Sequence, residues 1–227
     1  MKLPFLGRLS AAFLVLCITS LTISAQEKEV FKKKGLTLTF ISNDASFSPA
    51  LKKRLIETFF VVYPVLGKQY NQNTAKEVTF SIDTAYKGVA ATSGTVVSFA
   101  PQWFVKHGED IDVVTHEVMH IVQAYGNATG PWWVTEGIAD YVRNVYGVNN
   151  PAAKWMLGEY KPGQKYDNGY RVTARFFMWL EKNGHSGIVK VLDKSMREHT
   201  YSESIWKDQT SKTLDELWDA YVQNPAI

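Results

Sequence analysis

The residues best suited to chemistry are two histidines that flank a glutamate in the segment His116-Glu117-Val118-Met119-His120. Side chains four residues apart lie on one face of an α-helix, so both imidazoles can converge on one point. Neutral imidazole nitrogens are good ligands for Zn²⁺. The intervening carboxylate would lie beside the ion, where it can accept a proton from water. The spacing therefore predicts a Zn²⁺ site with His116 and His120 as ligands and Glu117 as general base.

A catalytic zinc ion usually has three protein ligands, and the next predicted helix offers the third. Thr135 is a candidate N-cap for this helix, which would place Glu136 in its first turn and Asp140 one turn further on. We expect Glu136 to be the third ligand and Asp140 to accept a hydrogen bond from a ligand imidazole. The alternative is that Glu136 only stabilises the positive end of the helix dipole.

The elements that must position these residues begin with strands. Apolar residues alternate with polar ones at 36–40 and 78–82, a period typical of half-buried strands. Between them, Ser48-Pro49 is a helix-start signal, followed by helical apolar spacing up to about Tyr70. The stretch 89–99 predicts a hairpin or an edge strand after a turn.

From Asp110 onward the pattern is helical. The site helix is amphipathic, and Gly126 and Gly147 are predicted to end the first two helices. The predicted helices are Asp110 to Tyr125, Thr135 to Gly147, about Asn168 to Lys182, about Ser186 to Glu198, and a last one opened by the capping box Thr213-Leu214-Asp215-Glu216. Strands first and helices afterwards indicate an α+β fold: a small N-terminal β-sheet with one helix, the active-site helix, and a mainly helical C-terminal part.

The N-terminus has the pattern of a secretory signal peptide. Lys2 and Arg8 precede an apolar run of roughly 15 residues, shorter than the about 20 that span a bilayer, and Ser24-Ala25 offers a cleavage site. We therefore predict a signal peptide at 1–25, a single domain at 26–227, and a secreted or periplasmic protein without stable membrane insertion. The only cysteine, Cys17, lies in the signal, so disulfides are not expected in the mature chain.

The charge balance argues against nucleic acid as a partner. The whole chain carries 25 Lys and Arg against 22 Asp and Glu, a net charge of +3. Loss of Lys2 and Arg8 with the signal peptide leaves 23 basic against 22 acidic residues. A nearly neutral protein has no electrostatic footprint for nucleic acid or an acidic membrane.

Several segments together resemble one known family. The segment 116–120, followed by Glu136-Gly137-Ile138-Ala139-Asp140-Tyr141-Val142-Arg143, is similar to the plant basic secretory protein family, which has bacterial members and is described as peptidases of plants and bacteria. The later segment 169–177, Met196-Arg197 and the helix around Leu217-Trp218 fit the same pattern. The resemblance covers roughly residues 35 to 221.

The resemblance implies a gluzincin-like zinc metallopeptidase with a zincin-like fold, acting on a peptide or protein substrate. It also implies that the strand at 96–99 lies beside the cleft and pairs with an extended substrate. Tyr170, in the family-like segment, is our candidate donor to the oxyanion, with Arg171 and Tyr166 as alternates. Packing is the competing role of Tyr170. Two other functions stay open: a non-catalytic binding protein on a zincin scaffold, and a zinc hydrolase of a non-peptide amide.

Overall fold

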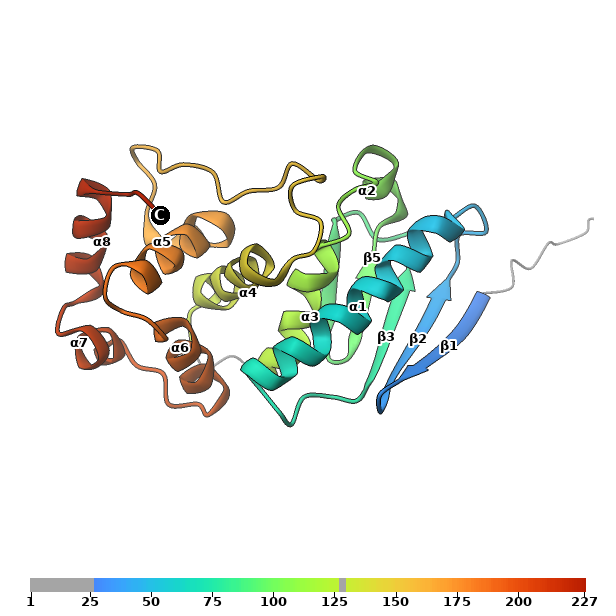
Figure 1. The fold of residues 1–227 in the computed structure, drawn as a ribbon, viewed down its shortest axis with the longest axis horizontal. Coiled ribbons are helices and arrows are strands. Elements are labelled where there is room, and N and C mark those ends of the chain that lie inside the picture. Colours follow the sequence, from blue (N-terminus) through green and yellow to red (C-terminus); the bar gives the residue numbers. More distant parts are fainter. Residues whose placement is uncertain (1–26, 127–129) are drawn as a thin grey trace, which may run out of the picture.

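The N-terminal part of the molecule is a five-stranded sheet that stands beside the helices of the C-terminal part (Figure 1). The computed structural model describes residues 27–126 and 130–227. The predicted signal peptide at 1–25 lies outside the described residues. The α+β class predicted from the sequence is confirmed, with the sheet first and helices afterwards.

The strand order in the sheet is β1-β2-β3-β5-β4. β1 pairs antiparallel with β2, the pairs β2–β3 and β3–β5 are parallel, and β4 pairs antiparallel with β5. β4 therefore forms one edge of the sheet. The strands span Glu27–Lys33 (β1), Leu36–Ser42 (β2), Glu77–Ile82 (β3), Ala90–Ser93 (β4) and Val96–Phe99 (β5).

The strand β1 was not predicted from the sequence. The structure pairs β1 with β2 along its whole length, through a turn in which Lys34 and Gly35 have positive φ. Alternating charges are tolerated there because an edge strand exposes much of its surface, and such charges discourage pairing with another chain.

Helix α1 (Pro49–Gln69) packs on one face of the sheet. It begins as predicted, with Ser48 Oγ accepting a hydrogen bond from the Leu51 amide. On the face it covers, Phe59 meets Phe80 of β3 edge to face with ring centroids 5.5 Å apart, and Leu38 of β2 is fully buried. This apolar layer fixes the sheet and α1 as one rigid unit.

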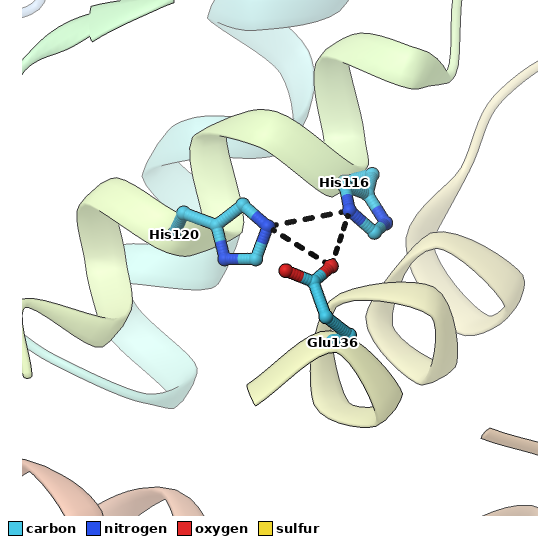
Figure 2. A group of neighbouring side chains, drawn as sticks. All are labelled: His116, His120 and Glu136. Carbon is cyan, nitrogen blue, oxygen red and sulfur yellow. Dashed lines mark hydrogen bonds and ion pairs between the residues drawn. The ribbon is translucent and has the colours of Figure 1, made fainter. Parts of the chain in front are cut away.

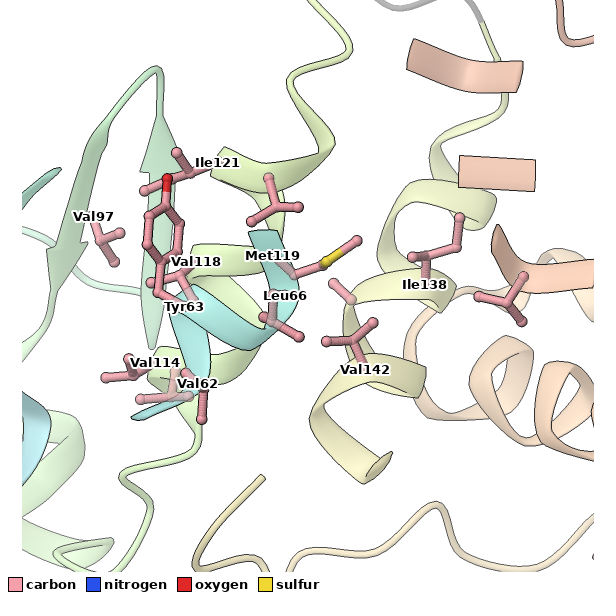
Figure 3. Packing of buried hydrophobic residues seen from close by; sticks show 14 of the residues in the cluster. Val62, Tyr63, Leu66, Val97, Val114, Val118, Met119, Ile121, Ile138 and Val142 are labelled. Atoms are coloured by element: carbon pink, nitrogen blue, oxygen red, sulfur yellow. The ribbon is translucent and has the colours of Figure 1, made fainter. Parts of the chain in front are cut away.

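Helix α3 (Val113–Gln123) carries the two histidines and lies in the middle of the core. Its apolar side chains pack between α1 and the sheet on one side and α4 (Trp132–Tyr146) on the other (Figure 3). Every residue of α3 except His120 is buried. Such packing leaves the helix little freedom to move, so its side chains keep a fixed geometry.

Helix α3 is shorter than the predicted span of Asp110 to Tyr125. Its N-cap is the buried Asp112. The Asp112 carboxylate accepts hydrogen bonds from the amides of Val148 and Asn149, which ties the start of α3 to the loop after α4. Its end is set by Ala124, which adopts the left-handed conformation two residues before Gly126. Gly147, in contrast, is the C-cap of α4 as predicted.

Helix α4 begins three residues before the predicted N-cap Thr135. Pro131 is the N-cap residue, and its carbonyl accepts a hydrogen bond from the Val134 amide. Glu136 therefore lies in the second turn of α4, not the first. The expectation of a first-turn position was wrong, because the helix already begins at Trp132, directly after Pro131.

The remaining helices complete the C-terminal part. The capping box that opens α8 is confirmed by reciprocal hydrogen bonds between Thr213 and Glu216. The helices α2 and α7 are short and were not predicted. These elements are α2 (Pro101–Lys106), the 3₁₀ turn η1 (Tyr166–Asn168), α5 (Tyr170–Lys182), α6 (Ile188–Arg197), α7 (Ser204–Thr210) and α8 (Leu214–Gln223). In the described ranges no helix combines the length and apolar content that a membrane span requires.

Candidate metal centre

Three side-chain atoms from α3 and α4 converge on one point (Figure 2). The Nε2 atoms of His116 and His120 lie 3.2 Å apart, and Glu136 Oε2 lies 3.3 Å from the first and 3.6 Å from the second. A tetrahedral ion with bonds of about 2.0–2.1 Å separates its ligand atoms by about 3.3–3.4 Å. The triangle therefore has the size that Zn²⁺ requires, and two imidazoles with one carboxylate are a donor set that suits it.

The hydrogen bonds behind the triangle leave its lone pairs facing one another. His116 Nδ1 lies 2.7 Å from Asp140 Oδ1, and His120 Nδ1 lies 2.7 Å from Gln123 Oε1. Gln123 is held in this orientation because its Nε2 donates to the Thr135 carbonyl at 2.9 Å. When each Nδ1 donates, each Nε2 is an acceptor. Three acceptors that share one point require a positive charge between them.

A proton can supply that charge in the absence of metal. Burial lowers the pKa of His116, but hydrogen bonds to Asp140 and Glu136 outweigh it and raise the pKa to about 10. Burial likewise raises the pKa of Glu136, but hydrogen bonds to His116 and His120 outweigh it and lower the pKa to about 2. The carboxylate is therefore ionised and the imidazole beside it is protonated at neutral pH, so a metal ion must displace that proton.

The centre opens into a cleft of about 1090 Å³ whose walls are the edge strand β4 and the helices α3, α4 and α5. Glu117 is nearly buried at its floor. The Thr92 hydroxyl lies 2.7 Å from Glu117 Oε2 and 3.0 Å from its carbonyl oxygen, so β4 fixes the orientation of this carboxylate. Tyr86 also lines the cleft and donates to the Ala90 carbonyl at 3.0 Å.

Tyr170 overhangs the centre from the start of α5. Its ring stacks on that of His116 with centroids 6.2 Å apart, and half of its surface is exposed. Burial and the charges of Glu136, Asp140 and Glu117 raise the pKa of its phenol, so the hydroxyl keeps its proton and can donate. These contacts place Tyr170 at the mouth of the cleft.

The backbone at Tyr170 is strained in a way that holds the ring in place. Tyr170 has a φ of +48°, a left-handed conformation that costs a non-glycine residue energy. Gly169 before it has a φ of +74°, and a Cβ there would lie 2.5 Å from the Trp132 ring. Only glycine lets the chain pass so close to Trp132 and deliver the tyrosine to this position.

The other predicted candidates lie elsewhere or have other partners. Tyr166 donates its hydroxyl to Asp215 at 3.0 Å and is not among the residues that line the cleft. Arg171 does line the cleft. The strand at 96–99 is β5, which pairs with β3 on one side and with β4 on the other. Both of its edges are occupied, so the expectation that it pairs with substrate is wrong. In the hairpin of β4 and β5, β4 is the outer strand, so the open edge of the sheet belongs to β4.

Three residues of this site were not predicted: Tyr86, Thr92 and Gln123. For Gln123 a signal existed, because it follows His120 by three residues and therefore shares its helix face. Tyr86 and Thr92 reach the site through the loop and hairpin after β3, where no local pattern fixes the direction of a side chain.

Comparison with known proteins agrees with this geometry. The sequence profile of the family described as peptidase of plants and bacteria matches residues 39–221. The chain belongs to this peptidase family. The comparison with curated protein sequences gives no match.

Solved structures share the fold of this family member at low sequence identity. A two-domain M1 zinc metallopeptidase bound to L-tryptophan has a TM-score of 0.54 and 12% identity, over 89% of this chain and 52% of the other. The M1 zinc metallopeptidase of Deinococcus radiodurans has a TM-score of 0.50 and 10% identity, over 89% and 52%. An aminopeptidase N family protein of Idiomarina loihiensis has a TM-score of 0.50 and 10% identity, over 86% and 46%. The chain spans about half the length of these proteins, and the likeness identifies a zincin-like fold.

The assignment of ligands predicts which substitutions release zinc. Glu136→Ala removes one vertex of the triangle and should leave the protein, after gel filtration, with little of the zinc that the parent retains. Asp140→Asn should weaken zinc affinity by about 10- to 100-fold, because the amide lacks the negative charge that strengthens the hydrogen bond from His116 Nδ1. Elemental analysis and chelator competition measure both effects.

The controls are Glu57→Ala and Asp219→Asn, at exposed positions of α1 and α8. Both should retain zinc like the parent. Unchanged zinc content in Glu136→Ala would exclude this residue as a ligand.

The raised pKa of His116 predicts that zinc uptake releases a proton. With a pKa of about 10, the imidazole carries its second proton throughout the neutral range in the metal-free protein. Zinc binding should therefore release about one proton from His116 per ion, and zinc affinity should rise with pH in this range. A pH indicator in weakly buffered solution measures the release. An absence of acidification on zinc addition near neutral pH would show that His116 is neutral before the metal binds.

Proposed function

We propose that this protein is a zinc-dependent peptidase that hydrolyses peptide bonds with Glu117 as general base. The observation that carries the proposal is the triangle of His116, His120 and Glu136, with the Glu117 carboxylate beside it at the floor of an open cleft. Membership of a peptidase family and the zincin-like fold support it. A zinc ion held by the triangle would lower the pKa of water toward 7 and polarise a carbonyl group.

The residues around the triangle would divide the proton transfers of amide hydrolysis. Glu117 takes a proton from the attacking water as the new C–O bond forms, and passes it to the amine nitrogen as the C–N bond breaks. Thr92 positions the carboxylate for both transfers through the contact at 2.7 Å. Asp140 and Gln123 hold the two imidazoles in the tautomer that presents Nε2 to the ion.

Tyr170 is the proposed donor to the developing oxyanion. It keeps its proton at neutral pH, it stacks over His116, and its strained backbone fixes its approach. A donor that is already in position stabilises negative charge that appears only in the transition state. The same residue would contribute little to substrate affinity.

The edge of β4 supports a peptide as substrate. Its outer backbone groups have no strand neighbour within the described sheet, and the strand runs along the cleft beside Glu117. An extended peptide can add to such an edge through main-chain hydrogen bonds, which do not depend on side-chain identity. This arrangement brings the peptide backbone, and so its carbonyl groups, next to the triangle.

Export is part of the same proposal. The features that support it are the apolar segment and cleavage site at 1–25, and the location of the only cysteine, Cys17, within that segment. The protein would then act as a secreted or periplasmic enzyme.

The Glu117→Gln variant tests the mechanism. The amide has the shape of the carboxylate but cannot accept the proton, so zinc content should stay at the parental level while hydrolysis falls by about 10²- to 10⁴-fold. Cleavage of a random peptide library, followed by mass spectrometry, measures the rate, and a zinc chelator should abolish it in the parent. Equal cleavage by this variant and the parent would refute the mechanism. Retained zinc with no cleavage by the parent would favour a binding protein instead.

The Tyr170→Phe variant tests the oxyanion donor. Loss of the hydroxyl should lower kcat by about 10²- to 10³-fold and leave KM nearly unchanged, because the donor acts in the transition state. Tyr166→Phe is the matched control, since its hydroxyl bonds Asp215 outside the cleft, and it should keep parental kcat. A Tyr170→Phe variant with parental kcat would leave the tyrosine with a packing role only.

A further inference from the structure

The two ends of the cleft have different chemistry. One end is lined by small or neutral residues, among them Asn73, Gly94, Thr95 and Gly126. The other end gathers two tryptophans, two arginines and one carboxylate: Trp103, Trp155, Arg143, Arg171 and Asp110. The second end is therefore where the cleft can recognise a charged group on a substrate.

Within this end, Arg143 already has its partners. It forms a buried ion pair with Asp110, and its Nε donates to Asn150 Oδ1 at 3.2 Å. Asp110 also accepts from Trp103 Nε1 at 2.8 Å. This group is neutral as a whole and ties the start of α3 to α4, so it is structural.

Arg171 is different, because its charge has no counter-ion in the described parts of the chain. The side chain is exposed, and its guanidinium lies 5.7 Å from the centre of the Trp155 ring. The hydrogen bond from its Nη1 to the Met156 carbonyl is long at 3.5 Å. The Trp155 ring, which also lies 4.4 Å from the guanidinium of Arg143, attracts the Arg171 guanidinium and leaves its N–H groups able to bind a carboxylate in bidentate fashion.

The direction of β4 relates this end of the cleft to one side of the cleaved bond. The strand begins at this end, since the Val89 carbonyl accepts from the Ala100 amide at 3.1 Å, just before Trp103. Further along, Thr92 lies at Glu117. Antiparallel pairing is the slightly more stable mode, and a peptide paired in this way places its C-terminal part toward Ala90.

We propose that Arg171 selects substrates that carry a carboxylate on the C-terminal side of the cleaved bond. The carboxylate is either an Asp or Glu side chain or the free C-terminus of the peptide, because both present the same two oxygens to a guanidinium. The inference rests on the proposed peptidase function and names its substrate class.

Binding to the zinc-loaded Glu117→Gln variant tests this without hydrolysis. The probes are fluorescein-labelled Ala-Ser peptides in two matched pairs: Glu against Gln at an internal position, and a free against an amidated C-terminus. At least one acidic probe should bind about fivefold more tightly than its neutral match, the size expected for a partly exposed ion pair. The pair that shows the difference identifies the source of the carboxylate.

Substitutions in the same background locate the preference. Arg171→Gln should abolish it, Arg171→Lys should keep part of it, and Arg171→Glu should favour probes with Lys over Gln. Lys182→Gln, at the other exposed end of α5, is the matched control and should keep the full preference. Zinc content and thermal melting check that each variant is folded.

Equal binding of acidic and neutral probes, or a preference that survives in Arg171→Gln, would overturn the inference. Cleavage maps of the same peptides with the parent then report the side of the bond, and an acidic preference on the N-terminal side would overturn the orientation. Hydrolysis by the parent reports separately on the proposed function, because binding and its dependence on Arg171 are measured without it.

Discussion

Three lone pairs aimed at one point are the arrangement on which the rest of this structure depends. Nitrogen and oxygen acceptors about 3.2 to 3.6 Å apart repel one another unless a positive charge lies between them. The protein holds them there with two helices that are tied together at both ends and in the middle. The ties are Arg143 to Asp110, His116 to Asp140, and Gln123 to the carbonyl of Thr135. The antiparallel pairing of α3 and α4 is thus the frame of the site.

The walls of the cleft differ in how firmly they are packed and in whether they expose unpaired backbone groups. The helical wall is set by core packing, since α3 is buried on almost all sides. The opposite wall is an edge strand, and its Thr92 hydroxyl contacts Glu117. Tyr170 closes the mouth from a third direction in a strained conformation. The site therefore combines a rigidly held His116, His120 and Glu136 group with a strand edge that has no partner strand in the described sheet.

Helical periodicity was sufficient to predict from the sequence which side chains gather at the candidate metal centre. His116, Glu117 and His120 follow from spacing alone, and Glu136 and Asp140 follow from the same rule applied to the next helix. The structure brings all five together. The N-cap of α4 was misplaced because Thr135 and Pro131 both carry start signals, and local sequence does not rank them.

The elements that were missed depend on tertiary contacts. β1 is strongly charged and becomes a strand only because β2 is there to pair with it. The edge position of β4 follows from strand order, which local patterns do not specify. Thr92 reaches Glu117 across 25 positions in sequence, and no periodicity links the two.

The extensive burial of α3 separates folding from metal loading. Small zinc domains that lack such a core reach their fold only with the ion bound. Here apolar side chains from the sheet, α1 and α4 hold the histidine-bearing helix without help from an ion. Under the proposed function, removal of zinc would therefore stop catalysis while the scaffold stays folded, and its return would restore catalysis without a new round of folding.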